Sequence, residues 1–151
     1  MNSKPCSVCR GQQVIQTPDQ RLYQRCPICH GTGQQRTPLF RVYDLSQALT
    51  ALQTNVQVVI PISDYDFEWQ YLTAFSTGAF SALISDGGKN RDFSIDAVHQ
   101  DLLFGDNNHP FPIKDIAPYV FTKRTNIKVT LNELSDAANT VWIGFIGSDL
   151  I

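Results

Sequence analysis

The sequence is short of cysteine over most of its length, and it has no long hydrophobic run. All four cysteines lie within the first 29 of 151 residues, which is not the pattern of disulfides scattered for stability. The longest apolar stretch, Val141–Ile146, is far too short to span a bilayer, and the opening residues lack the apolar segment of a secretory signal. We therefore expect a soluble protein that is made in a reducing cytoplasm.

Motifs of the common enzyme families are also missing. The sequence has no G-x-S-x-G elbow, no phosphate-binding glycine loop and no H-E-x-x-H pair. The best acid–base grouping combines three carboxylates at alternate positions with a more distant partner: Asp64, Asp66 and Glu68, with His99, Asp101 or His109. Such a cluster could bind a divalent cation or transfer protons. The solvent face of a half-buried strand explains the same spacing better, so we expect no enzymatic activity.

Acidic residues are scarce at the start of the chain. Residues 1–43 contain six basic side chains and the single acid Asp19, a formal charge of +5, whereas residues 44–151 sum to −7. The two parts therefore face different surroundings, or each other. At 151 residues, the chain has room for one ordinary domain and a small appendage.

The four cysteines form two C-x₂-C pairs, Cys6 with Cys9 and Cys26 with Cys29. Two such pairs at this separation predict a zinc site, because each tight knuckle aims two thiolates at one point. A pair of disulfides or a redox C-x-x-C is the alternative, although a redox motif needs only one pair. Four thiolates leave no open coordination position, so we expect one structural Zn²⁺ per chain. Between the pairs, residues 14–17 and 22–25 flank a Pro-Asp-Gln turn and predict a short hairpin.

The cysteine segments resemble a known zinc domain. Cys6-Ser-Val-Cys9-Arg-Gly11 and Cys26-Pro-Ile-Cys29-His-Gly31-Thr-Gly33 are similar to the C-x-x-C-x-G-x-G repeats of DnaJ-type chaperones. Only half of that family's repeats are present, and no J-domain with a His-Pro-Asp triplet accompanies them. The resemblance therefore implies a half-copy zinc ribbon over residues 1–38 and no chaperone activity.

Residues 39–54 are interpreted as a connector. Four apolar residues in it have helical spacing: Leu45, Ala48, Leu49 and Leu52. They predict a short helix at 44–53 capped by Asp44, but an extended arm fits the Gln and Thr content equally well.

From residue 55 the apolar period becomes two, which predicts β-strands. Alternating segments run from Val56 to Ile62, Phe67 to Tyr71, Phe80 to Ile84 and Ile127 to Leu131, and Val141–Ile146 is apolar on both faces, as a central strand is. The predicted fold is mainly β: a small zinc ribbon with four cysteine ligands, followed by an antiparallel β-sandwich, jelly-roll-like, over residues 55–151. Gly105–Pro118, with three prolines, is predicted to be a long functional or interfacial loop.

Several runs of this second part resemble β-sandwich virion proteins of tailed bacteriophages. They are Asp66-Phe67-Glu68-Trp69, Ser76-Thr77-Gly78-Ala79-Phe80 and Asp86-Gly87-Gly88-Lys89-Asn90-Arg91, with the later Leu103-Phe104-Gly105, Pro110-Phe111-Pro112 and Asn139-Thr140-Val141. The resemblance covers residues 55–151. It implies a non-enzymatic structural protein of the virion, a capsid decoration, minor capsid or neck subunit. The expected partners are other virion proteins and further copies of the same chain.

A small zinc-ribbon protein that binds nucleic acid is the alternative. Arg10, Arg21 and Arg25 belong to a basic ribbon that could lie on phosphates. Tyr23 is the one aromatic residue in that ribbon, so it offers little platform for base stacking, and four zinc-bound thiolates reduce its positive charge. We therefore favour protein–protein contacts, made by a zinc-stapled knob and by the sandwich.

Overall fold

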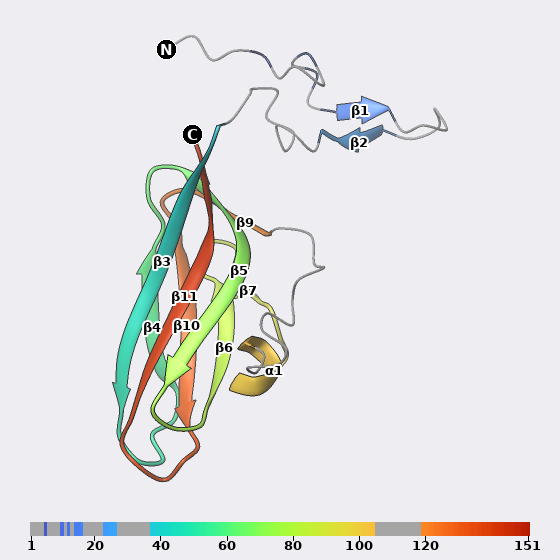
Figure 1. Cartoon of the computed structure of the whole chain (residues 1–151). Coiled ribbons are helices and arrows are strands. Elements are labelled where there is room, and N and C mark those ends of the chain that lie inside the picture. The colour runs from blue at the N-terminus through green and yellow to red at the C-terminus, as the bar shows by residue number, and fades with distance from the viewer. Residues whose placement is uncertain are drawn as a thin grey trace. The chain divides into compact units, whose positions relative to one another are not determined.

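The computed structural model describes residues 5, 10, 12, 14–16, 23–26, 37–104 and 119–151 (Figure 1). The chain divides into two compact units, which are considered separately: residues 1–38 with Ile151, and Leu39–Leu150. The predicted interfacial loop Gly105–Pro118 lies outside the described residues.

The first unit contains a two-stranded sheet. β1 (Val14–Gln16) and β2 (Tyr23–Arg25) pair antiparallel, with Val14 opposite Arg25 and Gln16 opposite Tyr23. This pairing confirms the hairpin strands predicted between the two cysteine pairs.

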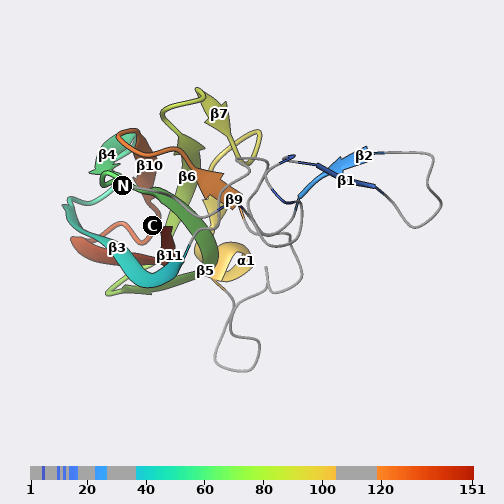
Figure 2. The ribbon, with the colours of Figure 1, turned by 90° about the horizontal axis from the view of Figure 1, so that it is seen from above.

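The second unit consists of two facing sheets, which Figures 1 and 2 show as two layers. The first sheet has the order β4 (Val56–Pro61), β10 (Asn126–Glu133), β6 (Phe80–Asp86) and β7 (Arg91–Asp92), and β8 (Val98–His99) also pairs with β6. The second has the order β3 (Pro38–Leu49), β11 (Asn139–Leu150), β5 (Asp66–Ser76) and β9 (Tyr119–Phe121). The pairings of β10 with β4 and β6, and of β5 with β11 and β9, are antiparallel, so the predicted mainly β class is confirmed.

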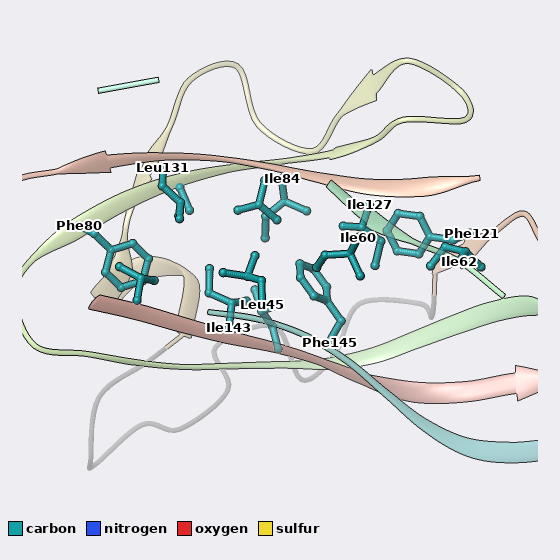
Figure 3. Close-up of a cluster of buried hydrophobic side chains, with 14 of the residues drawn as sticks. Leu45, Ile60, Ile62, Phe80, Ile84, Phe121, Ile127, Leu131, Ile143 and Phe145 are labelled. Atoms are coloured by element: carbon teal, nitrogen blue, oxygen red, sulfur yellow. The ribbon is translucent and has the colours of Figure 1, made fainter. Parts of the chain in front are cut away.

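The core lies between the two sheets, and period-two alternation builds it. In β10, every second residue from Ile127 to Glu133 is buried, and Val129 lies opposite both Val58 and Ile84 in the neighbouring strands. Figure 3 shows the side chains of the two layers meeting, with Leu131 and Ile84 on one side and Ile143 on the other. The only described helix, α1 (Gln100–Phe104), has five residues, and no described helix is long and apolar enough to cross a membrane.

The structure corrects the interpretation of residues 39–54 as a connector. Most of this segment is β3, an edge strand of the second sheet, and Leu45 and Leu49 are buried in the core. No helix forms at 44–53. Residues four apart share a face in a helix and also in a strand, so the spacing of these leucines fits both. Leu52, which the helix would have buried with them, is exposed, and Ala48 does not belong to the core.

A bulge in β5 corrects the predicted inward face of that strand. Tyr71 lies opposite Ile146 while Trp69 lies opposite Gly147, so Gln70 is an extra residue in the ladder. One extra residue moves the following side chains to the other face. Tyr71 therefore points outward, although the alternation with Trp69 predicted that it points into the core.

Candidate protein-interaction surface

The described residues include one of the four predicted zinc ligands. Cys26 follows β2 directly and is buried. Cys6, Cys9 and Cys29 lie outside the described residues, so the structural Zn²⁺ stays a prediction. Within the described ranges, no three His, Cys, Asp or Glu side chains gather in a way that could hold a metal ion.

The predicted phosphate-binding arginines are described only in part. Arg10 is exposed, with a left-handed φ of 50°, directly after the first cysteine pair. Arg25 ends β2, and Arg21 lies outside the described residues. Nucleic-acid binding by this ribbon is therefore still the alternative prediction.

Within the acid–base grouping considered in the sequence, the structure places Asp64 far from His99. Asp64 pairs with Arg124 at 2.8 Å, near the Asp86 end of β6. His99 lies opposite Ser81, five positions away along the same strand, which is roughly 16 Å at about 3.3 Å per residue. The carboxylate of Asp101 lies 3.5 Å from His99 Nδ1. His109 lies outside the described residues.

The most unusual surface of the second unit is the outer side of its β3–β11–β5 sheet. An antiparallel sheet that covers a core on one side normally presents polar side chains on the other. Here five large apolar side chains point outward from three adjacent strands and are partly exposed: Phe40 (71%), Val42 (42%), Tyr71 (43%), Phe75 (66%) and Trp142 (39%). We refer to these five residues as the outer apolar face.

The area of the outer apolar face is that of the largest patch on a typical monomer. With about 200 Å² for a fully exposed aromatic side chain, the exposed fractions amount to roughly 500 Å². The largest patch on a monomer is typically about 300–600 Å² and is often functional. This face therefore lies in the upper part of that range.

The face has a ridge and a hollow. Phe75 and Trp142 lie directly opposite each other on β5 and β11, and their ring centroids are 5.3 Å apart. The next outward position on β11 is Gly144, opposite Thr73, and here the surface is hollowed by a pocket of about 200 Å³. Asp44, on the neighbouring strand β3, also lines the pocket. Most of the lining is apolar, so the hollow suits an apolar side chain.

Buried carboxylates elsewhere in the second unit hold the fold. Asp86, at the end of β6, accepts hydrogen bonds from the Tyr119 hydroxyl at 2.7 Å and from the backbone N–H groups of Gly88 and Lys89. Burial raises the pKa of Tyr119, and its hydrogen bond to Asp86 raises it further. Because Tyr119 belongs to β9 and Asp86 to β6, this bond ties the two sheets together.

Asp149 performs a similar role near the end of β11. Its buried carboxylate accepts a hydrogen bond from Arg41 Nε at 2.7 Å, and the hydroxyls of Tyr43 and Ser63 lie 3.4 Å from it. The hydrogen bond to Asp149 and the charge of Asp149 raise the pKa of Arg41. This network connects β3 to β11 and to the loop after β4.

Glu133 and Asn139 form hydrogen bonds to loops at the end of the sandwich opposite Asp86. The buried Glu133 carboxylate accepts hydrogen bonds from Ser135 and from the backbone N–H groups of Leu52 and Asp136. The hydrogen bond from Ser135 lowers the pKa of Glu133. Asn139 Oδ1 accepts from two backbone N–H groups of the turn before β6. Sequence reasoning missed these buried polar residues, because the partners of Asn139 lie about 60 residues away and the nearby partners of Glu133 do not by themselves predict its burial.

Comparisons with known proteins identify no family. No family model and no curated protein matches this chain. A solved structure described as "Bacillus endospore appendages form a novel family of disulfide-linked pili" is similar at 16% identity and a TM-score of 0.33, over 76% of this chain and 92% of that chain. At that TM-score the similarity supports no argument about fold or role, so the function is argued from the surface.

Proposed function

We propose that this protein is a non-enzymatic structural subunit of a tailed-phage virion, at the capsid surface or the neck, and that it works by binding other proteins. The observation that supports a binding role is the outer apolar face, since exposed apolar patches of this size commonly mediate protein contacts. Its aromatic residues are the types that dominate the energetics of such contacts.

The strand order agrees with a virion protein but does not single one out. The chain crosses between the sheets at most connections, so that β3, β5, β9 and β11 lie in one sheet and β4, β6 and β10 in the other. The orders β3-β11-β5-β9 and β4-β10-β6-β7 are those of a jelly roll, the fold of many viral capsid proteins. Lectins and cupins share that fold, so the phage resemblance of residues 66–69, 76–80 and 86–91 is the feature that favours the virion.

The ribbon over residues 1–38 is proposed as a second anchor, stapled by one Zn²⁺. The register of β1 and β2 supports a shared site for Cys6, Cys9, Cys26 and Cys29. Because Val14 lies opposite Arg25, the chain that follows the first cysteine pair runs beside the chain that precedes the second. Cys26, the described member of the set, is buried, as a thiolate ligand of a structural zinc is.

Two experiments test the proposal. Purified phage particles test the virion location, and the purified chain tests whether the protein binds nucleic acid. An antibody against this chain should label purified particles of the phage that encodes it, and label confined to the soluble host lysate would contradict the virion role. The purified chain should show little affinity for duplex DNA at physiological salt. If it instead shifts DNA in the nanomolar range, with an affinity that falls steeply as salt rises, the zinc-ribbon nucleic-acid alternative is correct.

A further inference from the structure

We infer that the outer apolar face is a self-association surface, and that its occupant is the same face of a second copy of this chain, related by a two-fold axis. The inference rests on the proposed function, because it names a partner for the surface through which the protein is proposed to bind.

The shape of the face is complementary to itself. The Phe75–Trp142 pair forms the ridge, and the hollow at Gly144 and Thr73 lies beside it on the same strands. The hollow has a volume of about 200 Å³ and is open on its outer side, so an aromatic ring of a second copy can enter it. A two-fold axis between ridge and hollow places the ridge of each copy in the hollow of the other, as an isologous interface requires.

Gly144 makes the hollow. A Cβ at this position would lie 3.0 Å from the Thr73 methyl carbon and 3.9 Å from a Val42 methyl carbon. A side chain larger than that of alanine would project from β11 into the hollow. It would occupy the space that a ring from a second copy needs.

The area is sufficient for a stable pair. Each copy offers roughly 500 Å² from the five apolar side chains alone, so two copies bury about 1,000 Å². A biological interface should clear about 1,000 Å², and the range of about 1,200–2,000 Å² for stable interfaces is reached if polar residues around the five add a few hundred Å². Aromatic side chains at the centre with polar residues at the rim are the usual anatomy of such an interface.

The charges at the face do not oppose contact with a second copy. None of its five residues is charged, and although residues 44–151 sum to −7, charges more than about 8 Å apart are largely screened at physiological salt. Arg41, on the same strand as Phe40 and Val42, has its guanidinium bound to Asp149. The face therefore presents no cation to a phosphate, and Asp44 beside the hollow disfavours an acidic occupant.

Sedimentation equilibrium of the full-length, zinc-loaded chain tests the inference over about 1 to 200 μM. The wild-type chain should form dimers. Phe75→Glu should weaken the dimer by about 100-fold or more, because it places a carboxylate where a ring is buried in each half of the interface. Ile95→Glu is the matched control, since Ile95 is a 96% exposed apolar residue of the β7–β8 connection and should leave the dimer intact. Circular dichroism checks that both variants fold.

Gly144→Leu supplies a second, independent variant, and it should also dissociate the dimer by filling the hollow. A wild-type chain that stays monomeric throughout the range would overturn the inference, as would open-ended polymers. So would a dimer that survives Phe75→Glu, or one that Ile95→Glu weakens equally. Antibody labelling of phage particles tests the proposed function separately. If particles are labelled but the purified chain is monomeric, the proposed function stands and only the self-association inference is wrong.

Discussion

Replacing Tyr119 by Phe tests how far the sandwich depends on the link between its two sheets. The substitution removes one hydroxyl, which donates to the buried Asp86 carboxylate at 2.7 Å, and keeps the aromatic ring. The ring itself packs against Phe93 and Phe121, with centroids at 4.7 and 5.0 Å, and those contacts remain.

The expected loss follows from what Asp86 retains. A hydrogen bond to a charged group contributes about 1.5–3 kcal/mol to the free energy of unfolding. The backbone N–H groups of Gly88 and Lys89 still donate to Asp86, and Lys89 Nζ lies 3.6 Å from it, so the carboxylate is not left unpaired. We therefore expect Tyr119→Phe to lower the free energy of unfolding by about 2 kcal/mol, and the melting temperature by roughly 6–10 °C.

Urea unfolding at neutral pH measures this loss, with Tyr65→Phe at an exposed tyrosine as the control. Alkaline titration provides a second readout. Because the folded-state pKa of Tyr119 is raised, the unfolded chain loses that proton first, and stability should fall as pH rises above about 10. Tyr119→Phe should remove that part of the alkaline decline. A variant no less stable than Tyr65→Phe, with an unchanged alkaline limb, would refute the reasoning.

Three further predictions concern the metal, the bulge and the acid limb. Elemental analysis should find one zinc per chain, and zero or two zinc ions per chain would show that the site is misassigned. Cys26→Ser should unfold residues 1–40, because a segment this short depends on the metal for its folding free energy. Gly147→Ala should cost more stability than Gly144→Ala in urea unfolding, since its Cβ would lie 1.9 Å from the Glu68 carbonyl oxygen, and equal losses would count against the bulge. The lowered pKa of Glu133 implies stability that is present above about pH 4.3 and lost as pH falls through the folded-state pKa, so Glu133→Gln should flatten the acid limb of the stability profile.

Local patterns predicted the features whose physical cause is itself local. Alternation within Phe80–Ile84 and Ile127–Leu131 specifies strands with one buried face, and these segments pair in the core with Val129 opposite Ile84. The hairpin between the cysteine pairs was predicted in the same way, from two short runs around a turn. The cysteine spacing predicts a zinc site on similar grounds, because each knuckle forms within four residues.

The sequence by itself therefore determined the mainly β class, the core strands and the candidate metal ligands. Only the tertiary structure decided that Leu45 and Leu49 lie on a strand, because their partner strand β11 is distant in the chain and their spacing suits a helix equally. It also decided that Tyr71 points outward, since an extra residue opposite Gly147 reverses the alternation. The outer apolar face depends on both outcomes, because a side chain is exposed or buried according to which elements pack against it, and local sequence does not contain that information.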